Sequence, residues 1–118
     1  MVSAETQAQE LLATLDARLA ALMPQLATTA GEASLCMISR STGPVDGVKY
    51  LEGRMAVLSE LKRAVRREPA AALAVVADPI ARQWRTDLEL QRERGAVRGW
   101  VAYRAGGVDE LDELLGRD

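Results

Sequence analysis

Three observations in the sequence predict a mainly α protein, a small bundle of three to four helices that includes a short C-terminal helix. Alanine, leucine and valine dominate the apolar residues, which make up 48% of the 118-residue chain, and alanine and leucine are strong helix formers. Aromatic residues, which favour strands, total only 3%. Leucines recur at helical spacing near the N-terminus. The length suits one domain, so we expect residues 1–118 to form a single helical domain.

The first predicted helix covers residues 3–28. Ser3 is a suitable N-cap, because its hydroxyl can accept a hydrogen bond from a free amide of the first turn. The apolar side chains that follow recur in steps of four and three, the spacing of a coiled-coil stripe: Ala8, Leu12, Leu15, Leu19, Leu22 and Leu26. Such a stripe packs either inside its own domain or against a partner helix. Pro24 interrupts the pattern and is expected to kink or loosen the last turn.

Residues 29–47 break the helical pattern, and we expect a loop there. Their apolar segment SLCMIS is either a short buried strand or a packed loop, since six residues do not distinguish the two. A second helix is predicted over residues 46–68, capped by Asp46 and ended by Pro69, because a proline disfavours helical backbone in the residue before it. Gly53 costs about 1 kcal/mol inside a helix relative to alanine, so it indicates a close approach of another helix.

The following part of the chain predicts further helices. Residues 69–77 are apolar and contain five alanines, which favours a buried helix over a strand. Asp78 and Pro79 then match the N-cap and the first position of a new helix, and Gly95 matches the left-handed residue that follows a helix C-terminus. Residues 108–118 predict the short acidic helix at the C-terminal end.

Residues 98–104, RGWVAYR, leave two structures open. Their weak alternation of apolar and polar side chains suits a strand, and the alternative fold therefore contains a minor two-stranded element formed by residues 34–39 and 98–104. Because the sequence offers no second long strand, we expect residues 98–104 to be helical.

Residue types that most enzymes need are missing. The chain has no histidine and a single cysteine, Cys36, which excludes a Ser–His or Cys–His pair, an imidazole metal ligand and a four-cysteine zinc site. No glycine-rich segment matches a phosphate-binding loop. We therefore expect no enzymatic activity, no cofactor and no metal.

The sequence indicates neither a membrane-spanning nor a secreted protein. The longest apolar run, residues 70–77, is far shorter than the roughly 18 residues that span a bilayer. The first ten residues lack the basic and apolar blocks of a secretory signal, and a lone cysteine fits a reducing compartment. We expect a cytoplasmic protein with no membrane partner.

The charges are unevenly distributed along the chain. The net charge is −2, yet residues 40–104 carry thirteen basic and eight acidic side chains, while both ends are acidic. Arginine outnumbers lysine thirteen to two, and its guanidinium suits bidentate contacts to phosphate or carboxylate groups. Acidic ends can meet a neighbour's basic middle and so support self-association.

These features predict a non-catalytic protein-interaction or assembly module, such as an adaptor, that self-associates through its helical faces. The partner, expected to be a second copy of the chain, would contact Leu12, Leu15, Leu19 and Leu22. The alternative is an accessory nucleic-acid-binding protein that uses the arginine-rich segment 82–98. The candidate residues for that alternative are Arg82, Arg85, Arg92, Arg94, Arg98 and Trp100.

Overall fold

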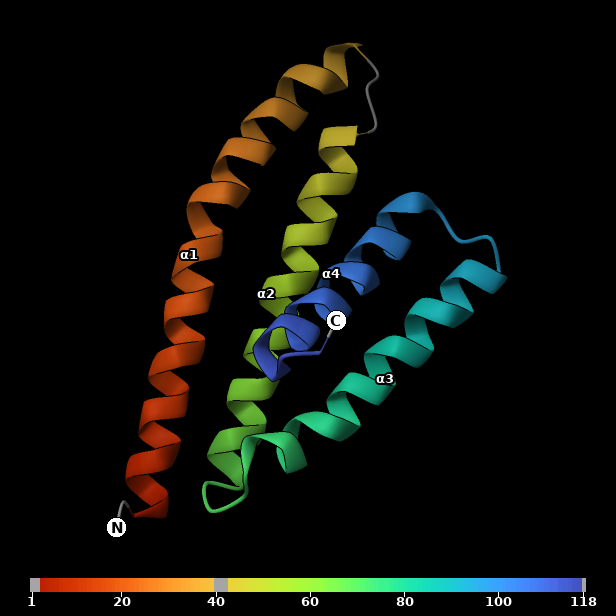
Figure 1. The fold of residues 1–118 in the computed structure, drawn as a ribbon. Helices are drawn as coiled ribbons and strands as arrows, with labels where there is room; N and C mark the ends of the chain where they lie inside the picture. The colour runs from red at the N-terminus through yellow and green to blue at the C-terminus, as the bar shows by residue number, and fades with distance from the viewer. Residues whose placement is uncertain (1–2, 40–42, 118) are drawn as a thin grey trace.

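Four helices make up the described part of the chain in a computed structural model (Figure 1). The structure describes the backbone of residues 3–39 and 43–117, and the side chains of residues 3–31 and 46–117. The helices are α1 (Ala4–Ser39), α2 (Gly43–Arg67), α3 (Leu73–Glu93) and α4 (Arg98–Leu115), and no strand occurs among the described residues. The predicted mainly α bundle is therefore confirmed.

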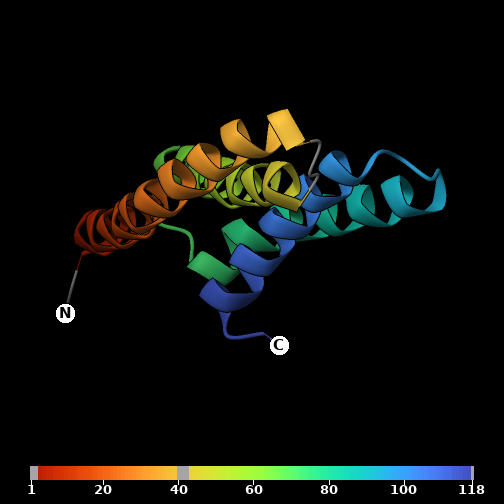
Figure 2. The ribbon, with the colours of Figure 1, turned by 90° about the horizontal axis from the view of Figure 1, so that it is seen from above.

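Helix α2 lies at the centre of the arrangement. It packs against α1 on one side and makes the most extensive interface of the molecule with α4, while α3 packs mainly on α4 (Figures 1 and 2). Helices α1 and α2 run in opposite directions as a long hairpin. The molecule measures 57 × 32 × 23 Å, and its long dimension matches the roughly 54 Å expected for a 36-residue helix such as α1.

Helix α1 is longer than predicted. It begins as expected, because the amide of Thr6 donates to the hydroxyl oxygen of Ser3 at 3.2 Å. The loop expected over residues 29–47 is wrong: α1 continues past Pro24 to Ser39, and α2 already begins at Gly43. Pro24 removes one backbone hydrogen bond, but leucines on both sides of it pack on α2, and this packing offsets the loss.

Helix α3 also differs from its prediction. It begins at Leu73 and runs through Asp78 and Pro79 without a break, so these two residues do not start a new helix. Val76 and Ala77 before the proline, and Ala81 after it, are buried in the core and hold the two parts in line. The buried helix expected over residues 69–77 is only partly correct, because residues 69–72 precede α3 and the side chain of Val75 is 64% exposed.

The turn between α3 and α4 agrees with the sequence. Gly95 has a φ of +64°, its amide donates to the carbonyl of Arg92, and the amide of Ala96 donates to the carbonyl of Gln91. These bonds complete the glycine-dependent helix end that was predicted.

Helix α4 combines two predicted segments. Residues 98–104 form its first turns, so the two-stranded alternative is not formed, and residues 34–39 belong to α1. The short acidic helix expected from residue 108 is the second half of the same helix. Gly106 and Gly107, which separate the two predicted segments in the sequence, are both buried within α4.

Glycines allow α2 and α4 to cross at very short distance. A Cβ atom on Gly53 would overlap the backbone carbonyl of Tyr103, and a Cβ atom on Gly106 would overlap the carbonyl of Tyr50. Each helix thus places a glycine against the backbone of the other, three residues after its own tyrosine. The close approach predicted from Gly53 is confirmed, and its partner is α4.

Candidate interaction surfaces

The leucine stripe of α1 faces the interior. Leu15 and Leu22 are buried, and Leu12 and Leu19 are partly buried against the same core. They pack on α2, whose Leu58 and Leu61 are fully buried. The structure therefore brings the four predicted partner-binding residues together on one face, and its own second helix already covers that face.

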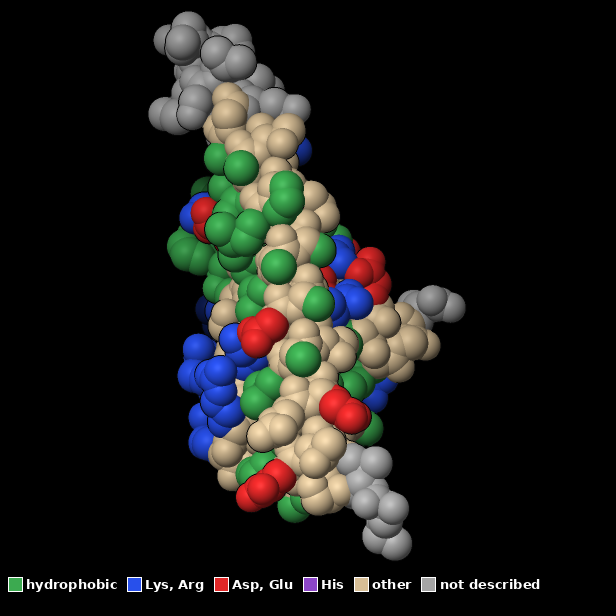
Figure 3. All heavy atoms as spheres, turned by 90° about the vertical axis from the view of Figure 1, so that its left-hand side faces the viewer, with side chains coloured by type: hydrophobic (Ala, Val, Ile, Leu, Met, Phe, Trp, Pro, Cys, Tyr) green, Lys and Arg blue, Asp and Glu red, His purple; other side chains and the backbone are tan. Residues whose placement is uncertain are grey.

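The opposite face of α1 is exposed and carries no charge. Its members are Ala13, Ala17, Ala20, Ala21, Pro24, Ala27, Thr28 and Gly31, all exposed to solvent. We call this set the alanine face. Two charged side chains occur between residues 13 and 31. Asp16 borders the face and pairs with Lys62 of α2, and Arg18 turns away to bind carboxylates of α4. Figure 3 views the molecule from the side of α1, where small and uncharged side chains follow much of the helix.

Three of the five arginines proposed for nucleic acid are already neutralised. Arg82 pairs with Asp78, Arg85 with Asp112 and Arg98 with Asp46, at N–O distances of 2.8–3.2 Å. The i, i+4 spacing of the first pair was visible in the sequence, whereas the other two pairs join different helices.

The remaining members of that set lie at the α3–α4 turn. Arg92 and Arg94 are exposed and form no ion pair with a described carboxylate. The Trp100 side chain is 51% exposed, the Lys49 ammonium lies 5.6 Å from its ring centre, and Tyr103 meets it edge to face. This part of the predicted site is accessible but offers only two free cations.

Sequence reasoning missed a second group of free cations at the end of α2. Of the fourteen lysines and arginines whose side chains are described, nine form ion pairs. The five that form no ion pair with a described acid are Arg92 and Arg94 at the α3–α4 turn, and Arg63, Arg66 and Arg67 at the end of α2. We call the last three the arginine cluster. In the sequence these arginines were counted only as part of the basic middle of the chain, residues 40–104. A signal in the sequence could have identified them. Arg63 and Arg67 are four residues apart and therefore neighbours on the helix, so each has a cation where an acidic partner would otherwise stand.

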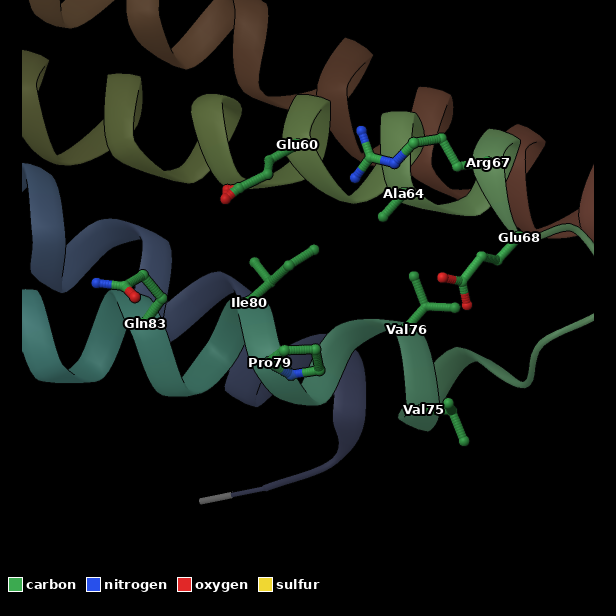
Figure 4. Close-up of a pocket in the computed structure, with 9 residues that line it drawn as sticks. All are labelled: Glu60, Ala64, Arg67, Glu68, Val75, Val76, Pro79, Ile80 and Gln83. Carbon is green, nitrogen blue, oxygen red and sulfur yellow. The ribbon is translucent and has the colours of Figure 1, made fainter.

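A groove of about 310 Å³ lies beside this cluster, between α2 and the start of α3 (Figure 4). Ala64, Val76 and Ile80 line it with apolar surface, and Arg67 stands on its α2 side. Its polar lining also includes Glu60, Glu68 and Gln83. The carboxylate of Glu60 is engaged, since the indole N–H of Trp84 donates to it at 3.3 Å.

A buried ionic network ties three helices together. Glu110 of α4 is only 2% exposed and accepts hydrogen bonds from Arg18 of α1 and from the Nε of Arg54 of α2, the latter at 2.9 Å. The same two arginines also bind Glu113. Because the charged groups of this network bind one another within the chain, the network has a structural role.

Electrostatics within the network reinforce that role. Burial raises the pKa of the Tyr50 hydroxyl, and its hydrogen bond to Asp109 raises it further, while Arg54 acts in the opposite direction. Burial opposes the charge of Arg54, but Glu110, Tyr50 and Glu113 outweigh that effect and hold the pKa of Arg54 above its usual value. The guanidinium of Arg54 therefore stays charged at the centre of the network.

Comparison of the chain with protein-family models, curated proteins and solved structures finds no match. Among the described residues, no three histidine, cysteine, aspartate or glutamate side chains come together as metal ligands. Within the same residues, none of the helices combines the length and apolar character needed to cross a bilayer.

Proposed function

We propose that this chain is a non-catalytic assembly module that pairs with a second copy of itself along the alanine face of α1. The observation that carries the proposal is that the eight exposed members of the alanine face, from Ala13 to Gly31, are all uncharged. A solvent-facing helix ordinarily carries charged residues opposite its core stripe. Charged residues are depleted where protein interfaces are fully buried, so this face can be covered with little desolvation cost.

A second copy is the occupant that best fits this face. An uncharged surface needs an uncharged partner surface, and the chain itself offers one. Two-fold symmetric dimers place the same patch of each subunit against the other and are the commonest oligomers. Alanine side chains allow the axes of two helices to approach closely, as glycines do where α2 crosses α4.

Light scattering after gel filtration tests the proposal. The wild-type chain should show twice the chain mass of 12.8 kDa, and the double variant Ala17→Glu, Ala27→Glu should show a single chain mass. Both positions are exposed, so the helical circular dichroism signal should persist. A matched control, Ala74→Glu with Thr86→Glu on exposed positions of α3, adds the same charge and should remain dimeric. A wild-type monomer at every concentration would refute self-association.

The alternative function, nucleic-acid binding through segment 82–98, has weaker support. Its favourable feature is the exposed Trp100 beside the free Arg92 and Arg94. Against it, intramolecular ion pairs occupy the other three arginines. If this alternative were correct, a short DNA duplex would shift the scattering mass at low salt and lose this effect as salt rises. The double variant Arg92→Gln, Arg94→Gln would abolish the shift.

A further inference from the structure

The arginine cluster at the end of α2 is unusual within this molecule. Most described cations are held by carboxylates, whereas Arg63, Arg66 and Arg67 are exposed and form no ion pair with a described acid. Lys62, in the same turn, is bound to Asp16 of α1. Cations near a helix C-terminus stabilise the helix dipole, but this effect falls off within the last turn and needs no cluster of three.

The cluster adjoins an apolar groove, and this adjacency points to a ligand with two kinds of surface. Arg67 lines the groove itself, and Arg63 lies one helical turn earlier on the same side of α2. Val76 and Ile80 supply apolar lining from α3 and point toward α2, whereas the 64% exposed Val75 lies at the edge of the groove and points away from α2 (Figure 4). A ligand that fills the groove therefore meets apolar side chains, the guanidinium of Arg67 and the carboxylates of Glu60 and Glu68. Arg63, just outside the groove, adds a second cation that forms no ion pair with a described acid.

We propose that the arginine cluster and this groove form a docking site for an acidic amphipathic helix of a partner protein. Apolar side chains of that helix would enter the groove between α2 and α3, and carboxylates along its flank would bind Arg63 and Arg67. Helix-in-groove recognition uses apolar anchors at i, i+3, i+4 and i+7 in this way. Guanidinium groups bind carboxylates with short, charge-assisted hydrogen bonds.

A protein helix fits the site better than a nucleic acid does. A phosphate backbone would use the arginines but would leave the apolar groove empty, and no described aromatic side chain lines that groove for a base to stack on. Glu60 and Glu68 also line the groove and would repel a uniformly anionic ligand. A helix with acids on one flank only can avoid both glutamates, and Glu60 already accepts the Trp84 indole N–H. This site is separate from the alanine face, so the proposal does not depend on self-association.

Fluorescence anisotropy with designed peptides tests the site on the full chain. The probe is a labelled amphipathic peptide with leucines at i, i+3, i+4 and i+7 and glutamates along one flank. A second peptide replaces every glutamate by lysine, and a third keeps the composition but scrambles the leucine spacing. We expect saturable binding of the glutamate peptide alone, with affinity that falls as salt rises. Equal binding of the lysine peptide or of the scrambled peptide would overturn the proposal.

Two variants and one control assign the binding to this surface. Arg63→Gln with Arg67→Gln, which removes two exposed charges, should weaken binding of the glutamate peptide by about tenfold or more. Val75→Asp, at an exposed position, should weaken it similarly by placing a charge at the groove. The control Arg92→Gln with Arg94→Gln removes two equally free arginines elsewhere and should leave the affinity unchanged. Equal loss in the control, no binding by the wild-type chain, or binding of a DNA duplex in place of the peptide would each overturn the proposal.

Discussion

Helix α2 is packed on two sides in two different ways. Toward α1 it presents leucines, and the interface is an ordinary apolar contact between two stripes. Toward α4 it presents Gly53 and Arg54, so the backbones meet directly and an ionic network closes the contact. On the first side, the loss of stability should grow with the number of side-chain atoms removed. The second side has no space for an added atom. The comparison shows that the largest interface of the molecule depends on its smallest residues.

The largest expected effect is on the crossing of α2 and α4. Gly106→Leu should destabilise the fold by about 3 kcal/mol or more, because any side chain there overlaps the Tyr50 carbonyl and forces the helices apart. Thermal unfolding followed by circular dichroism measures the loss. Gly31→Ala is the control: Gly31 is exposed with open space around its Cα, so alanine should stabilise the helix by about 1 kcal/mol. Equal stability of the two variants would refute the close crossing.

The next effect is on the leucine side of α2. Leu15 is fully buried, and Leu15→Ala should cost about 3 kcal/mol through lost apolar contact and the cavity left behind. Urea denaturation gives this value. The exposed Met23 lies in the same helix, and Met23→Ala should cost well under about 1 kcal/mol. If the light-scattering mass changed while the unfolding free energy did not, the stripe would face a partner instead of α2.

A smaller effect is expected in the ionic network. Glu110→Gln should cost about 2 kcal/mol, because Arg54 would keep its charge in a largely buried position, although the more exposed Arg18 can be hydrated again. Glu113→Gln removes a carboxylate that binds the same arginines but is 57% exposed, and should cost less than about 1 kcal/mol. Denaturation at neutral pH compares the two. Similar costs would mean that burial of Glu110 does not matter.

The smallest effect is the pH dependence that Tyr50 contributes. Since its pKa is raised in the folded state, folding favours the protonated hydroxyl, and this stabilisation is complete below the unfolded pKa of about 10. It is lost as pH rises through the higher folded pKa. The unfolding free energy of the wild-type chain should therefore fall more steeply as pH rises above about 10 than that of Tyr50→Phe. Parallel curves for the two proteins would contradict this assignment.

Local signals in the sequence predicted the start of α1 and the end of α3, because both depend on neighbouring residues alone. The Ser3 cap and the left-handed Gly95 were recognised because each makes its bonds within a few residues of its own position. The continuation of helices through Pro24, Pro79 and the Gly106–Gly107 pair was not recognised, because each of these residues destabilises a helix locally. Their cost is offset by contacts with residues far along the chain, and no window of sequence contains those contacts.

The candidate surfaces divide in the same way. The leucine stripe of α1 was visible from its spacing, but whether it faced a partner or the interior depended on α2. The five arginines of segment 82–98 were visible from composition. Whether each is free or paired was not visible, because two of them pair with acids on other helices, Asp112 and Asp46. The alanine face and the arginine cluster emerged only once the other faces of α1 and α2 were known to be occupied.

The sequence alone determined that this protein is helical, where its first helix begins and where its third ends, since propensity and capping act over one or two turns. The tertiary structure decided which helices continue through prolines and glycines, which stripe is buried and which arginines remain free. The physical reason is that packing and charge pairing join residues such as Gly53 with Tyr103, or Arg18 with Glu110, across most of the chain.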